Sequence, residues 1–332
     1  MQIQPSEDDY PAEAETGTAA QALPDPLVPA TAHPQPLSVE AALLIGLLAL
    51  VWGSSFILMK RGLSYFSAPE VASIRMVAAG ALMLPLALTR LRRIERRHLP
   101  YMLLSGVVGS FVPAYLFATA GKHIDSAISG ALNGLSPLFT LLLGLAFFNL
   151  KTSWQGYAGI LAGLAGALAL SLVKAGPATS LNAWAFLVVV ATLLYAININ
   201  LVKYRLQQAS SVTITAVALV PTGLLGTAVL VWATPFVGRI GQPGFWGVPL
   251  ICCLTLGIFG SAISIILYNR LLKQVSALVA STVTYLMPVV SLGWGIWDGE
   301  RVQSWQYVGL VLILAGMGLV GYANRRPRLR TV

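Results

Sequence analysis

Polar side chains stand singly inside long apolar stretches of this sequence, where they could bind a small polar molecule. Arg75 is the one cation placed well inside such a stretch. Its guanidinium could bind a substrate carboxylate or control a gate, and the structural alternative is that it pairs with carbonyl groups at a helix end. Glu70 lies five residues earlier, about 140° around a helix, so it is not an obvious partner for Arg75.

A second set of side chains places hydroxyl, amide and aromatic groups in the same apolar surroundings. Tyr195 and Asn198 are three residues apart and share one face of a helix, whereas Asn200 lies on another side. We expect the set to line a binding cavity, and interhelical hydrogen bonding is the alternative for any single member. The cavity-lining candidates are Ser54, Ser55, Arg75, Tyr115, Asn133, Ser136, Tyr195, Asn198, Tyr268, Tyr285 and Trp294.

The sequence lacks the groupings that catalysis or metal binding requires. His33, His98 and His123 have no metal-ligand spacing, and no phosphate-binding loop, nucleophile elbow or zinc-protease motif occurs. The adjacent Cys252 and Cys253 would point about 100° apart on a helix, which disfavours a disulfide between them. We therefore expect no enzyme activity, no metal and no cofactor. The alternatives are a membrane-embedded enzyme of lipid or isoprenoid metabolism and a lipid-linked sugar flippase.

The composition indicates an integral membrane protein. Hydrophobic residues make up 56% of the 332 residues and charged residues only 10%, against roughly a quarter charged in a typical globular domain. The mean hydropathy is +0.75. The formal charge of +9 comes from Lys and Arg in short gaps between apolar runs, which is typical of topology signals and lipid-headgroup contacts. We expect membrane lipids as partners and no nucleic acid.

Ten apolar runs are each long enough to cross a bilayer as a helix, which needs about 20 residues at about 1.5 Å each. Backbone in lipid must satisfy its own hydrogen bonds, and a β-barrel would show alternating polarity instead. The expected fold is therefore an all-α membrane protein with ten transmembrane helices. The runs are 39–59, 69–89, 99–119, 126–148, 153–173, 182–202, 212–234, 246–268, 275–297 and 303–323.

The distribution of Lys and Arg predicts the orientation. With a cytoplasmic N-terminus, 14 of the 21 Lys and Arg residues lie on the inner side and six on the outer side, which places both ends in the cytoplasm. Residues 1–38 are acidic and lack the basic start of a signal peptide, so we expect a disordered cytoplasmic tail. Residues 324–332 form a basic cytoplasmic tail. We predict a multi-pass protein of the cell (plasma or inner) membrane.

The two halves of the chain match each other in two registers. In the first, which we call the proline register, Pro137 falls on Pro288 together with a matched Lys, a matched Gly and a matched Trp-Gln pair. In the second, which we call the lysine register, the stretch 51–60 falls on the stretch 194–203, so that Lys60 meets Lys203. A shared proline and a shared Trp-Gln pair in one register indicate an internal repeat rather than chance likeness of apolar helices.

The repeats predict how the halves are arranged. Residues 39–173 and 182–323 each hold five of the expected helices, and five is odd, so the second half should enter from the opposite side of the membrane. Such inverted repeats are common in secondary transporters. Pro137 and Pro288 break the backbone ladder at matched places and are expected to be hinges, or else fixed kinks. The DGER stretch at 298–301 either caps the turn between the last two helices or forms a gating salt bridge.

Several motifs together resemble the drug/metabolite transporter superfamily, and its ten-helix EamA-like family most of all, over residues 40 to 323. They are WGSSF in the first run, PEVASIRM at 69–76, LSPLFTLLLGL, YLMPVVSLGWG and GER at 299–301. The resemblance implies two EamA repeats and a central cavity lined by helices 1, 3, 4, 6, 8 and 9. Family members often carry a Gly-Glu at the end of helix 4 as well, where this chain has Phe148 and Asn149.

These observations predict a secondary transporter that works by alternating access through a central cavity. The resemblance implies small polar metabolites such as amino acids as substrates, with export as the leading direction. A small-molecule substrate is the expected partner, and a homo-oligomer is left open. Because no acid lies deep in an apolar run, the sequence favours facilitated diffusion or exchange over coupling to protons or sodium.

Overall fold

The computed structural model describes residues 38–90, 94–147, 153–175, 178–281, 283–300 and 304–325. The chain divides into two units, residues 1–36 and 37–332, and every described residue belongs to the second unit. Most of both predicted tails lies outside the described residues, and so do the segment 148–152 and Arg301.

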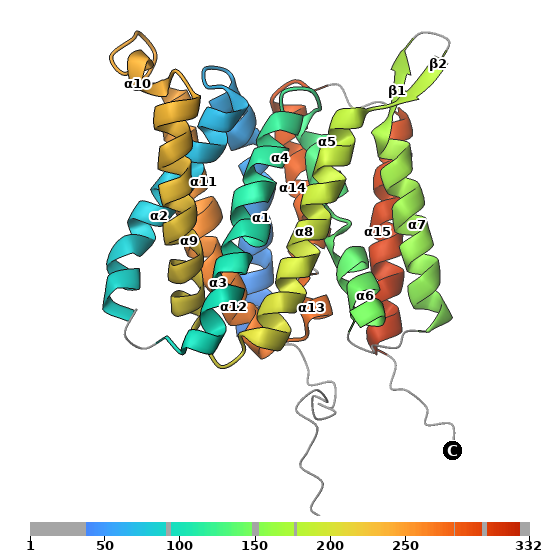
Figure 1. The fold of residues 1–332 in the computed structure, drawn as a ribbon. Helices are drawn as coiled ribbons and strands as arrows, with labels where there is room; N and C mark the ends of the chain where they lie inside the picture. Colours follow the sequence, from blue (N-terminus) through green and yellow to red (C-terminus); the bar gives the residue numbers. More distant parts are fainter. Residues whose placement is uncertain are drawn as a thin grey trace, which may run out of the picture. The chain divides into compact units, whose positions relative to one another are not determined.

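Helices form the first half of the second unit (Figure 1). Residues 96–120 form a short 3-10 turn followed by three helical pieces without a gap. The elements are α1 (Val39–Leu63), α2 (Ala68–Arg90), η2 (Arg96–His98), α3 (Leu99–Gly106), the π-helical η3 (Val107–Phe111), α4 (Val112–Ala120), α5 (Ser126–Asn133), α6 (Ser136–Phe147) and α7 (Trp154–Ser171).

The second half follows a short hairpin and is also mainly helical. Its elements are β1 (Leu172–Ala175), β2 (Ala178–Leu181), α8 (Ala183–Arg205), α9 (Ser211–Ala228), the π-helical η4 (Val229–Ala233), α10 (Phe236–Arg239), α11 (Val248–Gly257), the π-helical η5 (Ile258–Ile263), α12 (Ser264–Gln274), α13 (Ala277–Ser281), α14 (Val283–Trp297) and α15 (Ser304–Arg325).

Side-chain caps mark where helices begin. Ser38 Oγ accepts the amide of Ala41 at 3.1 Å before α1, and Ser210 Oγ accepts the amide of Thr213 at 3.1 Å before α9. The first turn of a helix leaves amide groups without backbone partners, and a serine oxygen at this position satisfies one of them. In both cases a serine in the sequence marks where the helix begins.

Eight helical segments among the described residues are long and apolar enough to cross a membrane. Each corresponds to one of the ten predicted runs. The two remaining runs, 153–173 and 303–323, correspond to α7 and α15. The eight segments are Val39–Leu63, Ala68–Arg90, Arg96–Ala120, Ile128–Phe147, Ala183–Arg205, Ser211–Ala233, Val248–Gln274 and Val279–Trp297.

A short antiparallel hairpin stands beside the helices, which otherwise fit the expected all-α fold. Strands β1 and β2 pair Leu172 with Leu181 and Ala175 with Ala178. Helix α7 therefore ends at Ser171, slightly before the end of the predicted run. Apart from this hairpin, the regular elements of the described residues are all helical.

Helices of the two halves pack in matching pairs. Helix α1 packs on α14, α11 and α12, and α8, its counterpart, packs on α6 and α4. Helices α2 and α9 are counterparts that pack on each other, as are α7 and α15, which lie side by side in Figure 1. The two π-helical segments η3 and η5 also stand at matching places, since Val107 falls on Ile258 in the proline register. The repeat seen in the sequence is therefore a repeat of packing as well.

The crossing of α2 and α9 shows this match at a single contact. A Cβ atom added to Gly80 would lie 2.9 Å from the Cα atom of Gly223, and one added to Gly223 would lie 2.9 Å from the Cα atom of Gly80. The two glycines fall on each other in the lysine register. Small residues let two helices approach this closely in a membrane, so the pair fixes where the halves meet.

Candidate functional site

A cavity lies between the helices of both halves and is lined mainly by polar and aromatic side chains. Its volume is about 100 Å³, room for several waters or for part of a small metabolite, since one water needs roughly 10–15 Å³ on the same measure. Helices α1, α2, α4 to α6, α8, α12 and α14 and the segments η3 and η5 all contribute lining residues. The polar ones are Ser55, Arg75, Ser110, Asn133, Ser136, Tyr195, Asn198, Tyr268, Asn269 and Thr284.

Arg75 is the charged residue of the cavity lining. Its Nε donates to the Oγ of Ser261 at 2.7 Å, and its guanidinium also interacts with the hydroxyl of Tyr195. Ser261 is fully buried in the π-helical η5, which packs on α2. No carboxylate among the described residues lies within ion-pair distance of Arg75 or lines the cavity. The guanidinium therefore has donors left for an anionic group of a ligand.

Glu70 has another partner, as its angular distance from Arg75 predicts. Its Oε2 accepts from Arg239 Nη1 at 2.8 Å and from the Ser67 amide at 2.7 Å. Arg239 belongs to α10, and it also donates to the carbonyl of Tyr65 at 2.6 Å. Glu70 is fully buried although it lies in the first turn of α2. This ion pair ties α10 to the connection between α1 and α2.

Two aromatic pairs flank the cavity at equivalent positions of the two repeats. The rings of Trp52 and Tyr268 are 5.0 Å apart between centroids, and those of Phe117 and Tyr195 are 5.8 Å apart. Trp52 falls on Tyr195 in the lysine register, and Phe117 falls on Tyr268 in the proline register. Aromatic faces can hold an apolar group or attract a cation, so both pairs can contact a ligand that carries either.

Asparagine side chains supply hydrogen-bonding groups beside these rings. Asn133 Nδ2 donates to the Sδ of Met287 at 3.6 Å, whereas its Oδ1 is buried and has no hydrogen-bond partner among the described residues. Asn198 Oδ1 accepts from Ser105 Oγ at 2.6 Å. A buried acceptor without a partner costs roughly 1–3 kcal/mol, so the Asn133 oxygen is suited to accept a hydrogen bond from a ligand.

The structure brings most of the predicted site residues together. Those that line the cavity are Ser55, Arg75, Asn133, Ser136, Tyr195, Asn198 and Tyr268.

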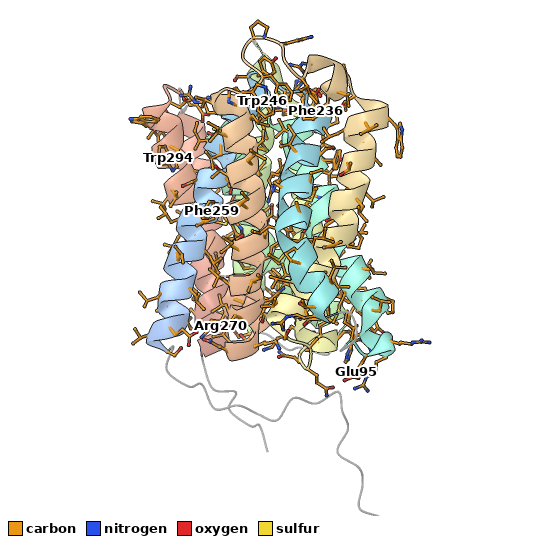
Figure 2. The ribbon with its side chains drawn as sticks, turned by 90° about the vertical axis from the view of Figure 1, so that its left-hand side faces the viewer. Glu95, Phe236, Trp246, Phe259, Arg270 and Trp294 are labelled. Carbon is orange, nitrogen blue, oxygen red and sulfur yellow. The ribbon has the colours of Figure 1, made fainter. Side chains whose placement is uncertain are left out.

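The other predicted site residues lie elsewhere. Ser54 and Trp294 are not among the lining residues, because Trp294 Nε1 donates to Ser54 Oγ at 2.8 Å and joins α1 to α14. Figure 2 labels Trp294 on its helix. Tyr115 is also absent from the lining, and its hydroxyl shares a 2.6 Å hydrogen bond with Ser73. Tyr285 belongs to α14, but its side chain lies outside what the structure describes.

Sequence reasoning missed several lining residues that the repeat registers could have identified. Trp52 is the counterpart of Tyr195, Thr284 is the counterpart of Asn133, and Phe117 is the counterpart of Tyr268. A residue whose counterpart lines a cavity between two matching halves should line it too. Asn269 gives no such signal, since its counterpart in the proline register is an alanine.

The two matched prolines sit in different local surroundings. Pro137 is the second residue of α6, directly after the turn that separates α5 from α6. Pro288 lies inside α14, and the residue between α13 and α14 lies outside the described residues. The fourth predicted run is therefore two helices joined by a turn, and the hinge role of both prolines stays a prediction.

Comparison with known proteins assigns the chain to a class. The model of the EamA-like transporter family matches residues 40–172 and 182–322, which cover both repeats. The inner membrane transporter YedA of Escherichia coli K12, whose function is uncharacterised, is 28% identical over 285 residues, covering 82% of this chain and 88% of YedA.

Two further relatives carry names that state a substrate. A protein of Streptantibioticus cattleyicolor, named a probable terminal-alkyne amino-acid exporter, is 24% identical over 84% of this chain and 92% of its own length. The S-adenosylmethionine/S-adenosylhomocysteine transporter of Chlamydia muridarum is 26% identical over 76% of this chain and 83% of its own length.

A solved crystal structure has the same fold. Its TM-score is 0.62 at 17% identity, over 86% of this chain and 98% of that chain. The apolar helices and the inner membrane relative show a multi-pass membrane protein. Two matched repeats cover nearly all of the helical part, and the chain therefore belongs to the EamA-like transporter family.

Proposed function

We propose that this chain is a secondary transporter that exports small polar metabolites bearing a carboxylate, such as amino acids, by alternating access through the cavity. The observation that carries the proposal is Arg75, a cation in the cavity lining that no carboxylate among the described residues neutralises. A charge at this depth is costly unless it meets a partner or water. A substrate carboxylate supplies that partner in a bidentate geometry.

The remaining lining suits the rest of such a substrate. The Asn133 oxygen and the aromatic faces of Trp52 and Tyr195 can receive an ammonium group through a hydrogen bond and through cation–π attraction. The name of the Streptantibioticus relative, an amino-acid exporter, supports the same substrate class.

Matching packing supports the alternating-access part of the proposal. We infer ten transmembrane helices in two inverted repeats, with α7 and α15 as the fifth and tenth. In an inverted repeat, each packing contact of one half has a counterpart in the other half, as α1 on α14 has in α8 on α6. The two open states are then related by exchanging the roles of the halves. Trp52 and Tyr195 are counterparts that both line the cavity. The cavity should therefore lie between the two halves in both the inward-open and the outward-open state.

The charges at the ends of the bundle support the proposed orientation, with both termini in the cytoplasm. Arg270 lies at one end of the helices, with Glu95 at the same end, and Phe236 and Trp246 lie at the other (Figure 2). The exposed Arg96, Arg97, Arg205 and Lys273 belong to the elements that meet at the Arg270 end. An excess of Lys and Arg marks the cytoplasmic side of a membrane protein.

Purified protein in liposomes tests the proposal. Amino acids, amines and nucleosides are screened by counterflow, and the recovered substrate is checked by mass spectrometry for chemical change. We expect carboxylate-bearing substrates to move unaltered, and Arg75→Ala to abolish their transport while the exposed-surface variant Arg97→Ala transports normally. A well-folded Arg75→Ala protein that transports at the parent rate would refute the role of Arg75, and conversion of a substrate would indicate an enzyme.

The cavity also bears on energy coupling. The described lining residues include no carboxylate that could carry a proton, and the buried Glu70, outside the lining, is paired with Arg239. We therefore propose facilitated diffusion or exchange. Imposing a pH gradient on the same liposomes decides this point, since substrate accumulation driven by the gradient contradicts the proposal.

A further inference from the structure

The end of α14 folds back over its own last turn. Gly299 has a φ of +83°, the left-handed conformation that glycine adopts most easily. The amide of Glu300 donates to the carbonyl of Gly295 at 2.9 Å, and the amide of Gly299 to that of Ile296 at 3.1 Å. These two bonds form a Schellman cap. Its geometry holds the carboxylates of Asp298 and Glu300 in place above the helix end.

These carboxylates join three helices. Lys60, near the end of α1, lies 2.8 Å from Asp298 Oδ2 and 2.8 Å from Glu300 Oε1, and Arg61 also pairs with Asp298. Glu300 Oε1 accepts from Ser126 Oγ at 2.7 Å and from the Ser126 amide at 3.2 Å, at the start of α5. The Glu300 side chain is only 3% exposed. A single carboxylate thus connects α1, α5 and α14.

A polar stripe on α5 leads from this ion cluster to the cavity. Ser126, Ser129 and Asn133 are three and four residues apart, so they share one face of α5. Ser129 Oγ and Asn133 Oδ1 are both buried without a hydrogen-bond partner among the described residues. Asn133 lines the cavity. A path for water or a polar substrate needs hydrogen-bonding groups along it. The unpartnered oxygens of Ser129 and Asn133 supply such groups between the cavity and the charged cluster.

The path is closed by close packing below the ion cluster. Gly130 lies on the same face of α5, and a Cβ atom added to it would clash with Ser291 of α14 and come within 3.4 Å of Phe56 of α1. Phe56 itself packs on Phe117 with ring centroids 5.8 Å apart. Helices α1, α5 and α14 are therefore in direct contact between the cavity and the cluster.

The opposite end of the bundle lacks this device among the described residues. Lys203 is the counterpart of Lys60 in the lysine register, and it donates to the carbonyls of Leu272 and Val275 at 2.8 and 2.7 Å. The position that matches Asp298 is Phe147, whose side chain is largely exposed. The lysine is kept in both halves, whereas the carboxylates that pair with it are found at the Lys60 end.

The geometry points to the seam between α1, α5 and α14 as the exit of the cavity at the Lys60 end, with Glu300 as the latch that holds it shut. This inference rests on the proposed transport function, since a seam needs to open only if a substrate passes. All three helices carry cavity-lining residues, for example Phe56, Asn133 and Met287, so parting them at the cluster opens the cavity directly. Opening exposes the separated ions to water, which keeps the cost of breaking them moderate.

A thiol reporter tests the latch without any substrate. In a chain with Cys252→Ala and Cys253→Ala, Ser129→Cys places a thiol in the closed path. A membrane-impermeant thiosulfonate is added to intact cells on the outer side, and labelling is followed by mass spectrometry. We expect Glu300→Gln to speed labelling about fivefold or more, as a shift between two states of a coupled site typically does.

Matched variants separate the latch from general loosening of the fold. Glu95→Gln removes an exposed carboxylate from an ion pair with Arg97 at the other end and should leave labelling unchanged. Ser126→Ala removes one hydrogen bond to Glu300 but no charge, and should give a smaller increase than Glu300→Gln.

Folding of each variant is checked by size-exclusion chromatography and thermal unfolding. Labelling at the parent rate in both Glu300→Gln and Ser126→Ala overturns the proposal, as does equal acceleration by Glu95→Gln. Since the readout needs no substrate, an incorrect substrate class leaves the result interpretable, and a chain that labels as expected but moves nothing in liposomes refutes the proposed function alone.

Discussion

Arg75 and Ala218 occupy equivalent positions in the two repeats, and each offers its backbone carbonyl to a matching glycine. Gly257 of α11 packs against the carbonyl of Arg75, and Gly106 of α3 packs against that of Ala218. The backbone contact is therefore the same in both halves while the side chains differ. The charge of the cavity comes from one repeat only, so a single position sets what the symmetric framework can bind.

Ser261 should position Arg75 for its ligand. We expect Ser261→Ala to raise KM for a carboxylate substrate about tenfold with little change in maximal rate, because a hydrogen bond to a charged group is typically worth roughly 1.5 kcal/mol or more. Initial rates in liposomes measure this, and Ser261→Thr should restore the parent KM because it keeps the hydroxyl.

A carboxyl-free analogue and a control on the same helix make this test specific. Transport of the analogue should not respond to Ser261→Ala. Thr89→Ala, which removes only an exposed hydroxyl that bonds within α2, should behave like the parent. Equal losses for both substrates would mean that Ser261 supports the fold rather than Arg75.

The Gly80–Gly223 crossing should be intolerant of one methyl group. We expect Gly80→Ala to lower the unfolding free energy by about 1–3 kcal/mol, the usual cost of overpacking, because its Cβ would press on Gly223. Thermal unfolding in detergent measures the change. Gly46→Ala is the control, since a Cβ there meets nothing within 4 Å and alanine favours a helix over glycine. Equal destabilisation by both changes would rule out the crossing as the cause.

The Glu70–Arg239 pair should matter far more than an exposed pair. Glu70→Gln leaves Arg239 without its carboxylate, and we expect a loss of about 3 kcal/mol or more in unfolding free energy, as for other buried pairs that lose one partner. Glu40→Gln breaks the exposed pair with Arg270 and should cost at most about 1 kcal/mol. Chemical denaturation compares the two. A double variant, Glu70→Gln with Arg239→Gln, should recover part of the loss because no lone charge remains.

Much of the fold could be predicted because lipid imposes a simple rule on apolar runs. Within the described residues, each of the ten predicted runs lies mainly on helix, and the register marked by Pro137 and Pro288 appears again in the positions of η3 and η5. The hairpin of β1 and β2 was missed because each strand has only 4 residues, too few to show a clear alternation of polarity. The turn between α5 and α6 was missed although Asn133-Gly134 and Ser136-Pro137 favour a turn, because apolar residues continue on both sides of them.

The candidate site was most predictable where one helix determines it. The shared face of Tyr195 and Asn198 follows from their spacing alone, and both line the cavity. Ser54 and Trp294 were expected there but bond to each other instead, because a single helix does not show which neighbour a side chain meets. The same limit hid Ser261, because its η5 is distant from α2 in the sequence but packs on it in the structure.

The two aspartates near the latch should respond to pH in opposite ways. The hydrogen bond from Lys60, aided by the charges of Lys60 and Arg61, lowers the pKa of Asp298 below its usual value. Partial burial, with the charge of Glu300 adding to it, raises the pKa of Asp125. An acid with a lowered pKa stabilises the fold above its unfolded pKa of about 3.9, and one with a raised pKa does the reverse.

Asp298→Asn should therefore lower the melting temperature at pH 7 and at pH 5, and its difference from the parent should shrink only as the pH falls through the lowered pKa of Asp298. Asp125→Asn should raise the melting temperature at pH 7, because the parent carries an unfavourable charge there. That gain should shrink as the pH falls through the raised pKa of Asp125, where the folded parent carboxyl becomes protonated, and should be largely lost by about pH 4. Thermal unfolding across this pH range measures both, and parallel pH profiles for the two variants would show that the cluster does not couple these carboxylates to folding.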